Sequence, residues 1–162
     1  MDLSTLQTTI QGRVLLPGDD GYREGSTGAK GPGTPLAVIR PADAADVAAA
    51  VGFARDHGLE LSVRGGGHDS RGMSTNDGGL VIDLSSLAGI EVDGQLVTIG
   101  GGAVWGDVAA GLAPHGLALS SGDTKTVGVG GLTLGGGVGW FVRLWGLAID
   151  SLESAEVVLV LG

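Results

Sequence analysis

Residues 36–64 read LAVIRPADAADVAAAVGFARDHGLELSVR, and this stretch predicts the fold class of the chain. The aliphatic run at its start predicts a strand, which ends at Pro41 because proline has no backbone N–H to donate. Asp43 is a good N-cap residue, and Asp46 three positions later forms a variant of the capping box. Apolar residues then recur with the spacing of one helix face, at Val47, Ala50, Val51 and Ala54.

The end of this helix and the strand that follows it are marked as clearly. His57 and Gly58 are typical of a helix C-terminus, where a cationic residue precedes a glycine. Leu59, Leu61 and Val63 alternate with polar residues, which predicts a half-buried strand with these apolar side chains on one face. A strand, a helix and a strand in this order form a βαβ unit, which we expect to be parallel and right-handed.

Further elements are predicted downstream. Residues 80–84 (LVIDL) predict a strand, and Asp93-Gly94 between two short apolar runs predicts a two-residue hairpin. Apolar spacing over residues 104–112 predicts a short helix that ends at His115-Gly116. Residues 157–161 (VVLVL) predict a buried strand. The chain is therefore a mixed α and β domain, in one piece or in two small lobes.

The composition limits the classes of function. The 162 residues fit one ordinary domain, and nine Lys and Arg against eighteen Asp and Glu leave a net charge of −9. This charge argues against nucleic acid and against a membrane as partners. The absence of cysteine excludes disulfides and thiolate chemistry, and no metal site is predicted. Neither a leader peptide nor a membrane-spanning run is seen in the sequence, so we expect a cytoplasmic protein.

Glycine is the residue in excess, with 33 positions, and it is concentrated in two segments. Residues 64–70 (RGGGHDS) follow a predicted strand, where glycines let backbone N–H groups approach an anion. The alternative interpretation is a flexible surface turn with an incidental histidine. Residues 122–139 (GDTKTVGVGGLTLGGGVG) combine hydroxyls, amides and Lys125, which suit phosphate oxygens. Together the two segments favour a nucleotide-type ligand, although the glycine spacing in the second does not fit the Rossmann fingerprint. The loop at residues 25–35 (GSTGAKGPGTP) resembles a P-loop only superficially, because it lacks the required motif.

A helical stripe overlaps the second segment. Apolar residues keep helical spacing at Leu134, Val138, Phe141, Val142 and Trp145. The four glycines within the same stretch would cost a helix about 3–4 kcal/mol. Either close packing of a helix on a sheet or a bound ligand could explain glycine here.

In these segments the sequence resembles the FAD-linked oxidases of the vanillyl-alcohol oxidase/PCMH superfamily, in particular the berberine-bridge-enzyme-like branch. The pairing of RGGGH with VGVGGLTLGGGVG is the specific part of the match. The resemblance implies an α+β fold, a PCMH-type FAD-binding domain of two small α/β subdomains with mixed sheets. Residues 1–35 would be an N-terminal segment and loop, and residues 36–162 the FAD-binding domain, without a substrate domain.

The resemblance also implies which residues bind FAD. His68 matches the histidine that such enzymes commonly join to the flavin 8α-methyl group. Thr124 stands where many relatives have a second, cysteinyl link, so any covalent bond would be single and through His68. The full set of implied cofactor-binding residues is Arg64, Gly65, Gly66, Gly67, His68, Asp69, Ser70, Gly72, Gly122, Thr124, Thr126, Val127, Gly128, Gly130, Gly131, Thr133, Gly136, Gly137, Gly139 and Val158.

The activity implied is oxidation of a small organic substrate by hydride transfer to FAD, with oxygen as acceptor, once a substrate domain completes the enzyme. The alternative is a truncated or stand-alone flavin-binding scaffold without catalytic activity. No catalytic acid or base is assigned. Asp69, Asp83 and Asp150 are candidates by charge only, and we interpret all three as structural.

Overall fold

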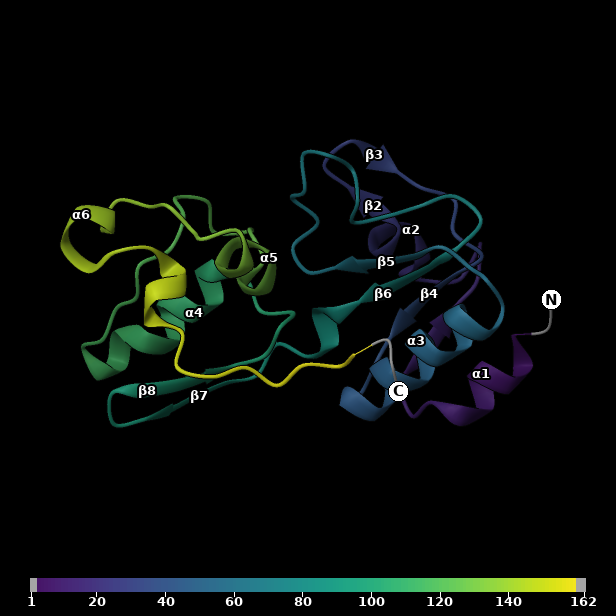
Figure 1. The fold of residues 1–162 in the computed structure, drawn as a ribbon, viewed down its shortest axis with the longest axis horizontal. Coiled ribbons are helices and arrows are strands. Elements are labelled where there is room, and N and C mark those ends of the chain that lie inside the picture. The colour runs from purple at the N-terminus through teal and green to yellow at the C-terminus, as the bar shows by residue number, and fades with distance from the viewer. Residues whose placement is uncertain (1–2, 160–162) are drawn as a thin grey trace.

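The computed structural model describes residues 3–159 and arranges them in two lobes (Figure 1). The first lobe is built on a four-stranded sheet in the order β1-β4-β6-β5. Its strands are β1 (Arg13–Leu15), β4 (Ala37–Arg40), β5 (Leu61–Arg64) and β6 (Leu80–Asp83). Its other elements are helices α1 (Ser4–Thr9), α2 (Tyr22–Gly25) and α3 (Ala44–Asp56) and the short strands β2 (Thr27–Gly28) and β3 (Gly31–Pro32). The sheet is mixed, because β1 is antiparallel to β4 whereas β4, β6 and β5 are parallel.

The predicted βαβ unit is present as β4, α3 and β5, and its two strands are parallel. They are not neighbours, because β6 lies between them and pairs with both. The core of this lobe lies between the sheet and helices α1 and α3, with Ile39, Phe53 and Ile82 among its buried members. The predicted helix end is confirmed, since His57 is the C-cap and Gly58 has a φ of 63°.

The start of α3 differs from the predicted capping box. Asp43 caps the helix by accepting a hydrogen bond from the Asp46 backbone N–H. The Asp46 carboxylate does not return this bond, because it accepts from the backbone N–H groups of Gln11, Gly12 and Ala42 at 2.8–2.9 Å. Burial raises the pKa of Asp46, but these three donors outweigh it and hold the pKa below the usual 3.8. Asp46 thus joins the N-terminal segment to the helix.

Because the Asp46 carboxylate accepts these hydrogen bonds only when it is ionised, we expect the fold to lose stability in acid. A group with a lowered folded-state pKa contributes stability that is complete above its unfolded pKa, near 3.8, and disappears as pH falls through the folded value. Asp46→Asn is therefore expected to lower the free energy of unfolding by about 1–3 kcal/mol at neutral pH and to flatten its fall below pH 4. Urea unfolding over a pH series measures both effects, with exposed Asp93→Asn as the charge control. An unchanged acid slope in Asp46→Asn would contradict this role.

The expected face of β5 is confirmed for Leu59 and Leu61, which pack against the core of this lobe, but not for Val63, which is 53% exposed. Ser62, on the other face beside Val81, is also buried. Asn76, from the loop before β6, explains this burial because its Nδ2 donates to Ser62 Oγ at 3.1 Å and to Leu80 O at 2.9 Å. A buried serine with a hydrogen-bond partner is tolerated in a core.

The second lobe packs a hairpin against helices. Its core consists of Ala103, Trp105, Val108, Leu112 and Ala148. Its elements, with the short helix that leads into it, are η1 (Leu84–Ser86), β7 (Ile90–Asp93), β8 (Leu96–Ile99), α4 (Trp105–Leu112), η2 (Ala113–His115), α5 (Val129–Leu134), α6 (Val142–Trp145) and η3 (Ala148–Ser151). The predicted hairpin and short helix are confirmed. The hairpin turn is shifted by one residue to Gly94-Gln95, because Asp93 pairs with Leu96.

Two predictions for the C-terminal third are wrong. The stripe over residues 134–145 is not one helix, because the chain leaves α5 at Gly135 and Gly136 and Gly137 adopt φ values of 97° and 78°. Residues 152–159 form neither helix nor strand and are largely exposed, and they have no pairing partner among the described residues. Residues 160–161 of the predicted strand lie outside the described range. No helix of the described chain is long and apolar enough to cross a membrane.

Candidate cofactor-binding site

The two glycine segments meet where the lobes join. The first loop, residues 65–72, follows β5, and the second loop, residues 122–128, precedes α5. A Cβ atom on Gly66 would overlap the backbone N of Gly128, and one on Gly128 would overlap the backbone N of Gly66. The loops therefore touch through bare backbone. Glycine is required at these two positions by the protein itself, whether or not a ligand is present.

The second loop is fixed to the start of α4. Trp105 N donates to Val127 O at 3.0 Å, and Gly106 N donates to Lys125 O at 2.8 Å. Gly101, which the sequence did not single out as a site residue, lies against the first loop and the start of α5, since its carbonyl oxygen is 3.7 Å from a Cβ built on Gly65 and 3.2 Å from one built on Gly130. Its only sequence signal is its place in the GGAVWGDV stretch, residues 101–108.

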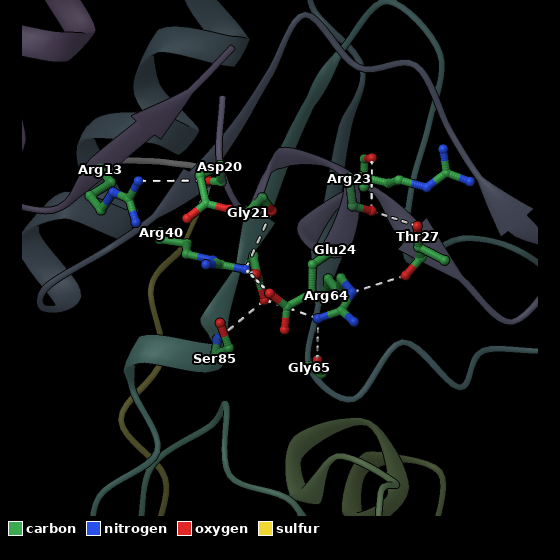
Figure 2. A network of polar contacts seen from close by, with 12 residues as sticks. Arg13, Asp20, Gly21, Arg23, Glu24, Thr27, Arg40, Arg64, Gly65 and Ser85 are labelled. Atoms are coloured by element: carbon green, nitrogen blue, oxygen red, sulfur yellow. Dashed lines mark hydrogen bonds and ion pairs between the residues drawn. The ribbon is translucent and has the colours of Figure 1, made fainter. Parts of the chain in front are cut away.

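Arg64 fixes the first loop from the sheet side (Figure 2). Its Nε donates to Thr27 O at 3.0 Å, and its Nη1 donates to Gly65 O at 3.3 Å and to Asp83 Oδ1 at 3.1 Å. Asp83 is fully buried and also accepts from Arg40 Nε at 2.9 Å. Arg64 is thus engaged by protein groups, and its geometry is that of a residue that holds the loop in place.

The other two carboxylates considered by charge are also engaged. Asp69 accepts from the Arg71 side chain at 3.1 Å and from Met73 N at 2.9 Å, and the Arg71 contacts, followed by Met73, lower the pKa of Asp69. Asp150 accepts from Leu147 N at 2.8 Å. With Asp83 held by two arginines, all three have the structural contacts that the sequence interpretation expected.

The first loop presents free backbone donors. Within residues 3–159, none of the backbone N–H groups of residues 66–70 donates a hydrogen bond to another residue. Gly67 has a φ of 73°, which bends the loop so that it can form an anion-binding concavity. Residues 66, 67 and 69 are half-buried and residues 68 and 70 are exposed, so these donors are accessible from outside the protein. A ligand rich in oxygen acceptors would satisfy them.

His68 lies at the surface of this loop and connects it to the second loop. Its Nε2 is 2.9 Å from Thr126 Oγ1, the one hydrogen bond that its imidazole makes within the described range. Thr124, in contrast, is exposed and its hydroxyl donates to Asp123 at 3.1 Å. The exposed imidazole is therefore held at one nitrogen and open at the other.

Several of the remaining implied residues can be placed by their contacts. Gly137 and Gly139 are needed for chain packing, because a Cβ there would overlap Ala148 and Leu132 or Ser121 O, whereas a Cβ on Gly122 would meet only the end of the flexible Leu132 side chain. Gly131 has no protein atom within 4 Å of a Cβ position, and the buried Thr133 Oγ1 has no partner in the described chain. Val158 is half-buried in the irregular C-terminal stretch, with no hydrogen bond to either loop.

These features fit FAD. Its pyrophosphate and ribityl oxygens need closely approaching donors, which the five free N–H groups of residues 66–70 supply. Covalent attachment of its flavin ring would need a nucleophile, and His68 in the same loop is a residue of that type. The unpartnered hydroxyl of Thr133 and the open backbone at Gly131 lie in α5, directly after the second loop. The residues present thus suit the group that the resemblance implies.

Comparison with known proteins agrees with this fit. The family model described as FAD binding domain matches residues 35–162. The chain is 41% identical over 158 residues to (R)-6-hydroxynicotine oxidase of Paenarthrobacter nicotinovorans, a match that covers 95% of the chain and 34% of that protein. The chain thus spans about a third of the length of this relative.

Solved structures give the same result. Xylooligosaccharide oxidase from Myceliophthora thermophila C1, in complex with xylobiose, superposes with a TM-score of 0.88 at 32% identity, over 97% of this chain and 34% of that one. Glucooligosaccharide oxidase from Acremonium strictum, described as carrying 6-S-cysteinyl, 8α-N1-histidyl FAD, superposes with a TM-score of 0.83 at 32% identity, over 93% and 33%. Both similarities extend over almost the whole chain described here.

Proposed function

Because the chain belongs to the FAD binding domain family of the FAD-linked oxidases, we propose that it holds FAD between its two glycine loops, joined covalently to His68. Residues 36–162 would be the FAD-binding domain, and residues 1–35 the segment that completes its sheet through β1. When bound, FAD supplies a ring that accepts a hydride from a substrate carbon and passes the electrons to oxygen. The relatives named above oxidise substrates as different as a hydroxynicotine and oligosaccharides, so the proposed substrate is a small organic molecule.

One observation carries this proposal. The five consecutive N–H groups of residues 66–70 donate to no residue in the range 3–159, and the exposed His68 lies in the middle of this run. Backbone donors can bind phosphate and hydroxyl oxygens without adding positive charge, which suits a chain of net charge −9. The loop therefore combines a binding surface with an attachment point.

The chain's own residues would prepare this loop for the cofactor. Arg64 and Asp83 set its position from the sheet, and the Gly66–Gly128 contact sets its distance from the second loop. Thr133 offers an unpaired hydroxyl that a bound group could satisfy. The covalent link would be single, because the glucooligosaccharide oxidase has a cysteinyl as well as a histidyl bond whereas this sequence contains no cysteine.

Replacing His68 separates binding from attachment. We expect the chain, incubated with FAD and freed of excess by gel filtration, to be yellow and to give a yellow pellet on acid precipitation. His68→Ala is expected to retain FAD in gel filtration, through the backbone donors, and to give a colourless pellet. Visible absorption of the eluate and of the dissolved pellet measures the two fractions. A wild-type chain that elutes without flavin would contradict the cofactor site, and a yellow His68→Ala pellet would contradict the assigned attachment point.

A further inference from the structure

We propose that Thr126 is the positioning residue that selects the Nδ1 atom of His68 as the nucleophile for the flavin bond. This inference rests on the proposed function, since it concerns how the covalent link forms. The observation behind it is the 2.9 Å contact between His68 Nε2 and Thr126 Oγ1, which joins the two glycine loops through their side chains.

The position of Thr126 is set by the backbone of both loops. A Cβ on Gly66 would press against Thr126 O, so the peptide that follows Thr126 lies directly on the first loop. Val127 N donates to Thr124 O at 3.2 Å and closes a turn around Thr126. The Thr126 hydroxyl has no other hydrogen-bond partner in the part of the chain that is described, so it is committed to His68. These backbone contacts hold the Thr126 hydroxyl beside the His68 imidazole.

This contact decides which nitrogen can react. A neutral imidazole has one N–H donor and one nitrogen with a lone pair, and only the lone pair can attack carbon. If Nε2–H donates to Thr126 Oγ1, the lone pair is on Nδ1. The other side chains close to His68 in sequence leave Nδ1 free, because Asp69 is occupied by Arg71 and Met73. In this tautomer Nδ1 carries the lone pair, and no hydrogen bond to it is found within residues 3–159.

The bond-forming step balances within the site. Nδ1 of His68 forms a bond to the 8α carbon of FAD, which loses one hydrogen from its methyl group while the imidazole loses its Nε2 proton. The electron pair released stays on the flavin ring, which is reduced by two electrons and takes up both hydrogens. Dioxygen then removes the two electrons and two protons as hydrogen peroxide. Once Nε2 has lost its proton it becomes an acceptor, and the same hydroxyl can turn to donate to it.

A hydroxyl suits these two steps because it can accept a hydrogen bond from Nε2–H before the flavin bond forms and donate one to Nε2 afterwards. A valine side chain of the same shape can do neither. Without the contact, His68 can present either nitrogen and its ring can rotate away. A hydrogen bond of ordinary strength corresponds to about a tenfold change in rate, which is the size of effect we expect.

The test compares Thr126→Val and Thr126→Ser with the wild-type chain and with Thr98→Val, a matched change at an exposed position of strand β8. Each protein is mixed with FAD, and the acid-stable flavin is followed over time, while reversible FAD binding is measured separately by gel filtration. We expect covalent incorporation, expressed per FAD reversibly bound, to slow about tenfold in Thr126→Val and to recover in Thr126→Ser. Thr98→Val should behave as wild type.

The linkage isomer gives a readout that a purely structural role would not change. We expect NMR of the isolated flavin peptide to show an Nδ1 link in the wild type and in Thr126→Ser, and a mixture of Nδ1 and Nε2 links in the residual product of Thr126→Val. Equal rates and a single isomer in wild type and Thr126→Val would overturn the role of Thr126 and leave the cofactor site intact. Absence of covalent flavin from the wild type would instead overturn the proposed attachment, and this inference with it.

Discussion

Alanine at position 83 is expected to lower the free energy of unfolding by about 3–5 kcal/mol, because it leaves buried charges without their partner. The Asp83 side chain is fully buried and pairs with Arg40 at 2.9 Å and Arg64 at 3.1 Å. The two arginine side chains are only 16% and 15% exposed, so water replaces the lost carboxylate poorly. Loss of the Asp83 carboxylate should also loosen the hold of Arg64 on the first loop. The fraction of chains loaded with FAD should therefore fall together with the free energy of unfolding.

Arg40 offers a matched control for this prediction. Its second partner, Glu24, is 70% exposed and lies 3.0 Å from Nη2. Glu24→Gln is expected to cost less than about 1 kcal/mol, since exposed ion pairs contribute little. Urea unfolding followed by circular dichroism compares the two variants. If Asp83→Ala cost no more than Glu24→Gln, the buried cluster would not be the element that joins sheet and loop.

Alanine at position 66 or 128 is expected to separate the two glycine loops. Each added methyl would overlap backbone atoms of the other loop, which cannot rotate away as a side chain could. We expect a loss of about 1–3 kcal/mol from each substitution, together with loss of FAD binding, because the site consists of both loops. Thermal unfolding and FAD gel filtration measure the two effects.

Gly52 provides the comparison for these variants. It lies within α3 with no protein atom within 4 Å of a Cβ position. Gly52→Ala should therefore raise stability by roughly 0.5–1 kcal/mol, as expected for a helix interior, and leave FAD loading unchanged. Tolerance of alanine at both positions 66 and 128 would show that the loops do not meet through bare backbone.

Sequence periodicity predicted the elements that depend on local signals. The Asp43 cap, the Gly58 end of α3 and the hairpin around Gly94 are determined by residues within a few positions of one another. The parallel arrangement of β4 and β5 followed from their order with α3. The sequence could not show that β6 lies between these strands, because a later strand entered the sheet.

The failed predictions concern partners that are distant in the sequence. Ser62 is buried on the second face of β5 because Asn76 supplies a hydrogen bond, and no local pattern shows that contact. The stripe from Leu134 to Trp145 has helical spacing, yet glycines with positive φ end the helix, so spacing was outweighed by backbone conformation. Residues 157–159 have strand composition but no strand beside them among the residues described.

The sequence predicted which segments form the site, but not why glycine is required at each of their positions. Both glycine loops were identified from the sequence, and the structure brings them together. Glycine at 66 and 128 was interpreted as room for a ligand, whereas the structure explains it by contact between the loops. That contact joins two segments far apart in the chain, and only the fold reveals it. The free N–H groups of residues 66–70 are the part that a ligand explains.

Peptide mapping of the FAD-loaded chain shows whether His68 carries the flavin. Trypsin cleaves after Arg64 and Arg71, so His68 is released in the short peptide Gly65–Arg71, which contains no other nucleophile suited to the flavin bond. Mass spectrometry after denaturation and digestion is expected to find this peptide heavier by one flavin group, with fragmentation that places the group on His68. Flavin on any other peptide, or an unmodified Gly65–Arg71 peptide from acid-stable yellow protein, would contradict the account.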